Sequence, residues 1–205
     1  GMLYTLHEEL LHPDTNLLLL SYTNRAVVEI CSKLQGAHIP FLRIGNALAC
    51  QPQYQAYLLD NQVKNCSSLV QLQDIISKTR VFVGTVTSMN SAQAIFKYKQ
   101  FSLEIIDEAS QILEPHIIGL LSAMHGTKPA IERFVMIGDH KQLPAVVQQN
   151  EQESAVDNPL LHQIGLHNCR LSLFERLLHL YGKDPSITYM LTRQGRMHQE
   201  IADIP

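Results

Sequence analysis

The fold class of this chain is decided by the stretch FSLEIIDEASQ, residues 101–111. A short apolar run bounded by turn residues is typical of a buried parallel strand. In open α/β sheets ligands bind at the carboxyl ends of strands, where Asp107 and Glu108 are expected. One carboxylate there can hold a hydrated Mg²⁺, and the other can deprotonate an attacking water. The alternative is an ordinary strand end with two solvated acids, which an isolated Asp-Glu pair favours.

Other apolar runs of strand length lie along the chain, and each ends in polar residues. The further predicted strands are 17–20, 39–44, 81–83, 134–137 and 187–191, and the predicted helices are 2–11, 27–34, 69–76, one from 114, and 171–181. This alternation predicts an α/β fold with a doubly wound, mostly parallel sheet and helices on both faces. We expect a single domain over residues 1–205, with a helical insertion at about 45–79 and a flexible loop at 145–157.

Composition limits the functional class. The chain has 205 residues, of which 45% are hydrophobic and 17% charged, as expected for a globular protein with one sizeable core. The net charge of −3 provides no general basic field, so any nucleic-acid binding must use a local track. The four cysteines form no CxxC pair, which favours a reducing cytoplasm. No apolar run approaches the length of a membrane span, and no signal peptide is present, so we expect no membrane partner.

Hydroxyl and amide side chains follow two of the predicted strands. Ser21, Thr23 and Asn24 follow the first, and Thr85 and Thr87 follow the third. Such groups beside a helix N-terminus can hold a phosphodiester, or they can simply cap the helix. The local sequence favours neither interpretation.

Tyr54 and Tyr57 present a similar choice between two roles. They can stack on bases, but no basic residues interleave with them, so we expect them to pack against helices.

Taken together, the blocks resemble the first RecA-like motor domain of superfamily 1 helicases, in the up-frameshift and splicing-endonuclease branch. The matching blocks, in the family's order, are SYTNRAV at 21–27, GTVTS at 84–88, IDEASQ at 106–111 with EP at 114–115, GDHKQLP at 138–144, SLFERL at 172–177 and QGRMH at 194–198. The IDEASQ block corresponds to the Walker B strand of P-loop NTPases. The resemblance covers roughly residues 15–204, and it implies a RecA-like fold.

The resemblance implies roles for individual positions. Asp107 holds Mg²⁺ through water, and Glu108 activates the hydrolytic water. Gln142 senses the γ-phosphate of ATP, and Arg196 contacts it. ATP and Mg²⁺ are the implied cofactors, and a second RecA-like domain of the same polypeptide is an implied partner. Single-stranded DNA or RNA is the other implied partner, and it would lie along Ser21, Thr23, Asn24, Thr85 and Thr87.

Three departures from the family pattern stand out. No G-x-x-x-x-G-K-[ST] phosphate loop occurs in the 205 residues. In the family this loop directly precedes the helix expected at 2–11, so we expect a fragment that begins after the loop. The chain also stops near the expected start of the second RecA-like domain. Gly195 stands where the family usually has an aromatic residue that stacks on adenine, and Gln199 replaces the usual proline.

Two functions follow from this reading. The first is motor domain 1 of an ATP-dependent helicase or translocase, inactive in isolation. The second is a non-catalytic, helicase-like scaffold that binds nucleic acid or protein. The motor is favoured by the presence of Asp107, Glu108, Gln142 and Arg196, because a scaffold has no physical need for them. Gly195 favours the scaffold, because it replaces the aromatic residue that stacks on adenine in the family.

Overall fold

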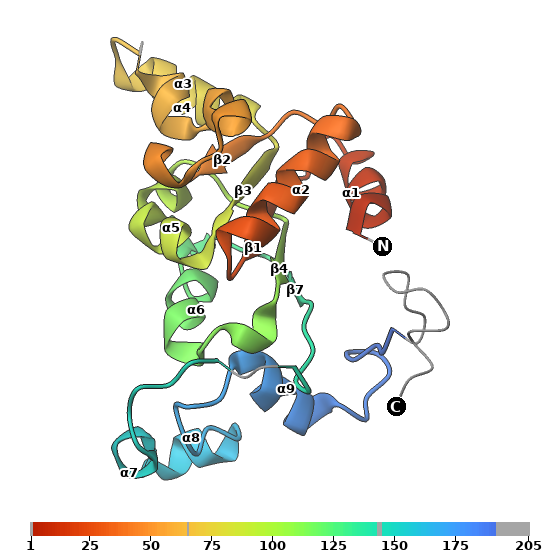
Figure 1. Cartoon of the computed structure of the whole chain (residues 1–205), viewed down its shortest axis with the longest axis vertical. Helices are drawn as coiled ribbons and strands as arrows, with labels where there is room; N and C mark the ends of the chain where they lie inside the picture. The colour runs from red at the N-terminus through yellow and green to blue at the C-terminus, as the bar shows by residue number, and fades with distance from the viewer. Residues whose placement is uncertain (1, 65, 143–144, 192–205) are drawn as a thin grey trace.

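The central feature of the computed structural model is a five-stranded sheet in the order β2-β3-β1-β4-β7 (Figure 1). The structure describes residues 2–64, 66–142 and 145–191. The strands are β1 (Leu17–Ser21), β2 (Leu42–Ile44), β3 (Val81–Thr85), β4 (Leu103–Asp107) and β7 (Phe134–Met136). Every pairing in this sheet is parallel. The predicted doubly wound α/β fold, with the strand of the Asp-Glu pair inside the sheet, is therefore confirmed.

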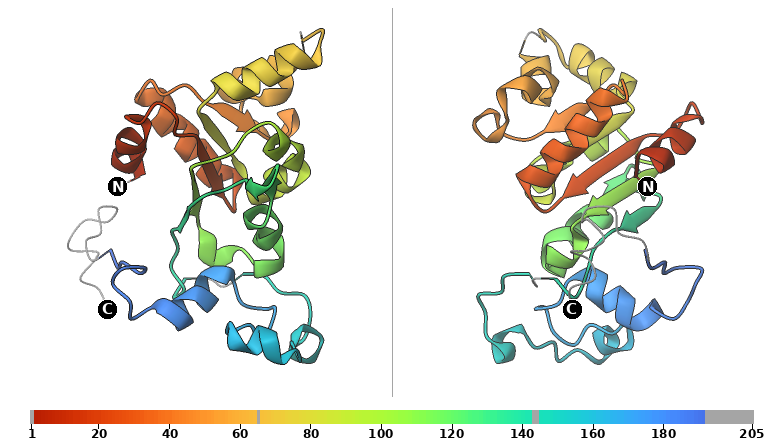
Figure 2. Two further views of the ribbon diagram at one scale, coloured as in Figure 1. Left: turned by 180° about the vertical axis from the view of Figure 1, so that it is seen from behind. Right: turned by 45° about the vertical axis from the view of Figure 1, so that its right-hand side comes forward.

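Different helices cover the two faces of the sheet (Figure 2). On one face, Leu17 and Leu19 pack with α1 (Met2–Leu10) and α2 (Asn24–Gly36). On the other, Leu18 and Leu20 share a core with α4 (Leu69–Lys78), α5 (Val86–Ser91), α6 (Glu114–Leu121) and α9 (Leu173–Tyr181). Successive strand side chains point to opposite faces, so a continuous leucine run fits a strand buried on both sides. Burial of each leucine contributes about 1.5–3 kcal/mol.

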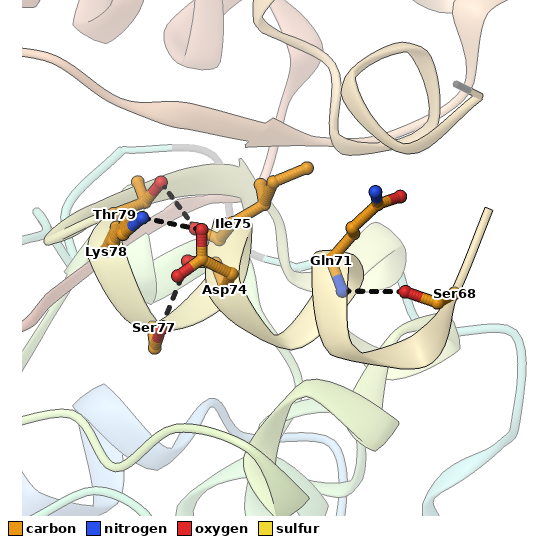
Figure 3. A network of polar contacts seen from close by, with 7 residues as sticks. All are labelled: Ser68, Gln71, Asp74, Ile75, Ser77, Lys78 and Thr79. Carbon is orange, nitrogen blue, oxygen red and sulfur yellow. Dashed lines mark hydrogen bonds and ion pairs between the residues drawn. The ribbon is translucent and has the colours of Figure 1, made fainter. Parts of the chain in front are cut away.

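Residues between β2 and β3 form a helical segment made of η1 (Ala47–Ala49), η2 (Pro52–Tyr57), α3 (Leu59–Val63) and α4. Helix α4 begins where the Ser68 hydroxyl accepts a hydrogen bond from the Gln71 backbone N–H (Figure 3). Tyr57 stacks on Phe41 with ring centroids 4.4 Å apart, and Tyr54 is buried. The packing role expected for both tyrosines is therefore confirmed.

Residues 187–191 do not form the expected strand. The backbone N–H groups of Ile187 and Thr188 both donate to the Asp184 carbonyl, so the chain turns there. The side chains that follow are largely exposed, as Tyr189 at 84% illustrates. A strand needs a neighbour for its backbone groups, and within the described residues the sheet ends at β7. The sequence pattern indicates residues that favour a strand, but it does not indicate whether a neighbouring strand is available to pair with them.

The region from 122 to 165 contains short elements that the sequence did not indicate. A two-stranded hairpin joins β5 (Met124–His125) to β6 (Lys128–Pro129), and Gly126 takes the positive φ of its turn. Helix α7 (Glu151–Ser154) lies inside the stretch expected to be a loop, and it is followed by α8 (Pro159–Gln163). No helix in the described ranges is long and apolar enough to cross a membrane.

A buried ion pair connects α9 to α6. Arg176 donates from Nε and Nη2 to the two carboxylate oxygens of Glu114 at 2.7 and 2.5 Å, and from Nη1 to the Ile164 carbonyl at 2.7 Å. Both charged side chains are less than a tenth exposed. The pair links α9 to α6, the helix that follows the turn at Asp107 and Glu108.

Arg176→Ala should lower the free energy of unfolding by about 3 kcal/mol, because it leaves the Glu114 carboxylate buried without its partner. Urea denaturation measures this change. Lys78→Ala is the matched control, because it breaks the exposed Lys78–Asp74 pair and should cost less than about 0.5 kcal/mol (Figure 3). Equal losses in the two variants would show that the buried pair does not hold α9 in place.

Candidate active site

Polar strand ends gather at one edge of the sheet. In the parallel register, Ser21 at the end of β1 lies between Thr85 of β3 and Asp107 of β4. The strands that end at Ser21, Thr85 and Asp107 therefore open on the same edge of the sheet. This is the edge at which open α/β sheets bind ligands.

The turn after β4 holds Glu108 in an unusual backbone conformation. Glu108 has φ 55° and ψ 32°, in the left-handed region that residues with a Cβ seldom occupy. Its N–H donates to Asp107 Oδ1 at 3.0 Å, and the next N–H, of Ala109, donates to the Ile137 carbonyl at 2.9 Å. Such a conformation costs on the order of 1 kcal/mol and persists where surrounding contacts fix it, commonly at functional sites.

The Glu108 carboxylate is held by two hydroxyl groups from the end of β1. Ser21 Oγ and Thr23 Oγ1 donate to Glu108 Oε2 at 3.1 and 2.9 Å. Thr23 Oγ1 also accepts from the Ala26 N–H at 3.2 Å and so caps α2. Ser21 is fully buried. Sequence reasoning assigned both hydroxyls to nucleic acid and missed their contact with Glu108.

Gln142 lies in the same pocket as the two carboxylates. The pocket has a volume of about 460 Å³, and Asp107, Glu108, Ser110, Asp139 and Gln142 are among its lining residues. Gln142 therefore lines the same pocket as the Asp-Glu pair, while its role as a phosphate sensor stays a prediction.

Asp139 is a site residue that sequence reasoning missed. Its Oδ2 accepts from Gln142 Nε2 at 3.2 Å, and its Oδ1 accepts from the Lys141 N–H at 2.9 Å. Its own N–H donates to Ser110 Oγ at 3.3 Å. A Cβ on Gly138 would lie 2.9 Å from the Ser110 backbone nitrogen, so glycine permits this close approach. The i, i+3 spacing of Asp139 and Gln142 within a turn was the available signal.

Burial raises the pKa of Asp107, and the nearby Glu108 charge adds to the rise, although the hydrogen bond from the Glu108 N–H opposes it. A bound cation would favour the ionised carboxylate. Among the described residues, no group of three or more His, Cys, Asp or Glu side chains is placed to hold a metal. A carboxylate such as that of Asp107 is the kind of hard oxygen donor that would suit Mg²⁺.

The remaining predicted nucleic-acid residues differ in exposure. Thr87 and Asn24 are exposed. Thr85 is buried and caps α5, with Oγ1 accepting from the Ser88 N–H at 3.0 Å. Beside Asn24 lies Arg43, a buried cation whose guanidinium donates to Asn24 Oδ1 at 3.5 Å.

Arg196, Gly195 and Gln199 lie outside the described residues. The predicted contact of Arg196 with the γ-phosphate, and the effect of Gly195 in place of an aromatic residue, therefore stay predictions.

Known proteins resemble this chain over most of its length. A family model described as an AAA domain matches residues 67–150. The DNA replication ATP-dependent helicase/nuclease DNA2 of Gallus gallus is 31% identical over 191 residues, which cover 92% of this chain and 17% of that protein. The corresponding protein of Homo sapiens is 32% identical, with 92% and 16% covered. The helicase/nuclease JHS1 of Arabidopsis thaliana is 32% identical, with 95% and 13% covered.

Among solved structures, the Hef helicase domain of Pyrococcus furiosus gives a TM-score of 0.41 at 12% identity, covering 68% of this chain and 25% of that chain. The chain spans less than a fifth of the length of the DNA2 and JHS1 relatives. Over most of its length, the chain is therefore homologous to a segment of these ATP-dependent helicase/nucleases.

Proposed function

We propose that this chain is motor domain 1 of an ATP-dependent helicase or translocase that moves on single-stranded DNA or RNA. The observation that carries the proposal is the gathering of Asp107, Glu108 and Gln142 on one pocket at the carboxyl edge of the sheet. The relatives' names describe ATP-dependent helicases of DNA replication, which supports DNA as the substrate.

Each pocket residue has a chemical task in this proposal. Phosphoryl transfer needs positioned charge rather than covalent chemistry. Asp107 would hold Mg²⁺, and the ion would supply positive charge to the phosphates. Glu108 orients the attacking water and takes its proton. Gln142 offers both a donor and an acceptor, so its amide can distinguish phosphate from water. Arg196 and a second RecA-like domain supply further positive charge.

The energetic cost of the site argues against a passive scaffold. Asp107 is partly desolvated, and Glu108 occupies a left-handed backbone conformation. Both features lower stability, and they are found where a site requires them. A scaffold would gain nothing from either feature.

The isolated 205-residue chain should hydrolyse no ATP, because no phosphate-loop amides or lysine are present to hold the β- and γ-phosphates. A phosphate-release assay with Mg·ATP and single-stranded oligonucleotide tests this expectation. If the isolated chain hydrolyses ATP and Glu108→Gln abolishes that hydrolysis, the chain is a complete enzyme. Hydrolysis would then not require a separate phosphate loop.

Gln142→Ala should preserve nucleotide binding and weaken the stimulation of hydrolysis by nucleic acid, in a polypeptide that joins this chain to a phosphate loop. The reason is that Gln142 connects the Asp139 turn to the pocket that holds both carboxylates. The ratio of turnover with and without oligonucleotide is the measurement. Gln152→Ala, on exposed α7, is the control and should leave the ratio unchanged. An undiminished ratio in Gln142→Ala would exclude Gln142 as the relay.

A further inference from the structure

The hydrogen bonds of Glu108 link the pocket to the neighbouring strand end. Both hydroxyl donors end on the same carboxylate oxygen, Oε2. Ser21 and Asp107 are partners in the register of β1 and β4, so the turn that carries Glu108 lies directly beside Thr23. The contact therefore follows from the packing of two adjacent strands.

Thr23 is placed where two acceptors would compete for its hydroxyl. A hydroxyl group has one proton and can donate to only one acceptor at a time. Thr23 Oγ1 already accepts from the Ala26 N–H, and its proton goes to Glu108. Thr23 is half-buried between Tyr22, which is 42% exposed, and exposed Asn24. A phosphate oxygen that accepts a hydrogen bond from Thr23 Oγ1 must therefore take the proton that Glu108 now uses.

Ser21 is placed differently. It is fully buried at the end of β1, so a nucleic acid cannot contact it in this conformation. Its hydrogen bond to Glu108 would therefore survive when Thr23 turns away. Ser21 anchors the carboxylate, and Thr23 is the exchangeable contact.

We propose that Ser21 and Thr23 form a clasp on Glu108, and that a single-stranded nucleic acid opens it by drawing the Thr23 hydroxyl to a phosphate. The inference rests on the proposed function and adds a regulatory step to the same site. The two hydroxyl donors hold Glu108 Oε2 at the end of β1. Loss of the Thr23 bond frees the carboxylate to turn towards the water, so an occupied track promotes hydrolysis. Thr23 is thus a positioning residue for Glu108.

Thermodynamic coupling makes the proposal testable without ATP. If the strand and Glu108 compete for Thr23, then removing the Glu108 acceptor must strengthen strand binding. Glu108→Ala removes the acceptor, whereas Glu108→Gln removes the charge but keeps a carbonyl acceptor. The two variants have equal net charge, so their difference isolates the hydrogen bond from the electrostatic effect.

The experiment measures fluorescence anisotropy of a labelled oligo(dT) at low salt with the 205-residue chain. We expect Glu108→Ala to bind about fivefold more tightly than Glu108→Gln, as one released hydrogen bond implies. When each is combined with Thr23→Val, the two should bind equally, because the exchangeable hydroxyl is gone. Ser77→Ala removes an exposed hydroxyl on α4, away from the site, and should bind like the wild type (Figure 3). Circular dichroism and thermal unfolding establish that each variant is folded.

The possible outcomes distinguish failure of the clasp from failure of the proposed function. Equal binding by Glu108→Ala and Glu108→Gln, with Thr23 intact, would overturn the clasp and leave the nucleic-acid track standing. A difference that persists with Thr23→Val would also overturn it, because the effect would not pass through Thr23. No binding by the wild type or any variant would overturn the proposed function together with the clasp.

Discussion

Glu108→Gln should lower ATP hydrolysis by about 10²–10⁴-fold and leave nucleotide binding near the wild-type value, in a polypeptide that joins this chain to a phosphate loop. Glutamine keeps the shape of glutamate and can still accept from Ser21 and Thr23. It cannot take a proton from water, so only the chemical step is lost. Single-turnover hydrolysis and binding of a fluorescent ATP analogue measure the two quantities separately.

Glu29→Gln is the matched control for this substitution. Glu29 is exposed on α2 and lines the same pocket, so the substitution removes one negative charge there without touching the Glu108 clasp. Its turnover should stay within about threefold of the wild type, as expected for a screened charge. Near-normal turnover in Glu108→Gln would mean that another group activates the water.

Glu104 should make the stability of this chain depend strongly on pH. Its side chain is fully buried in β4, between β1 and β7, and neither carboxylate oxygen has a hydrogen-bond partner among the described residues. Burial raises the pKa of Glu104 from 4.5 to about 8. The folded chain therefore holds a proton on Glu104 at neutral pH that the unfolded chain has released.

The sign of the pH effect follows from this difference. The contribution of Glu104 to stability is fully present below pH 4.5, where both states are protonated. It declines as the pH rises, because only the unfolded state ionises, and the loss is complete near pH 8. One pKa unit corresponds to about 1.4 kcal/mol, so the loss over this window is about 5 kcal/mol.

Glu104→Gln should therefore raise the free energy of unfolding by about 5 kcal/mol at pH 8 and by little at pH 4.5. Urea denaturation across this pH range measures the difference between variant and wild type. Glu132→Gln, at an exposed site before β7, is the control and should shift stability by less than about 0.5 kcal/mol at every pH. A Glu104→Gln gain that did not change with pH would show that Glu104 is ionised or partnered in the folded chain.

The sequence predicted those parts of the site that depend on local pattern. The apolar run before Asp107 indicates its own strand, and chain order places Gln142 after the neighbouring strand. The contact of Thr23 with Glu108 joins residues 85 positions apart. It depends on β1 lying beside β4 in one particular register, which no local pattern specifies. The hydroxyls were therefore recognised as functional, but their partner was not.

Burial and strand pairing were the other features beyond the reach of the sequence. The apolar residues at 187–191 suit a strand, yet within the described structure they have no neighbouring strand. The run that contains Glu104 was predicted to be a buried strand, but the local pattern does not show that the Glu104 carboxylate has no hydrogen-bond partner among the described residues. In each case the tertiary surroundings decide the outcome, and local composition does not report them.

The proposed coupling of ATP hydrolysis to nucleic-acid binding is tested most directly by the rate of hydrolysis with and without a single-stranded oligonucleotide. The measurement uses a polypeptide that joins this chain to a phosphate loop and a second RecA-like domain. We expect the oligonucleotide to accelerate hydrolysis, because Thr23, which is proposed to contact the strand, is hydrogen-bonded to Glu108 at this edge of the sheet. A rate that is the same with and without oligonucleotide would contradict the proposed coupling.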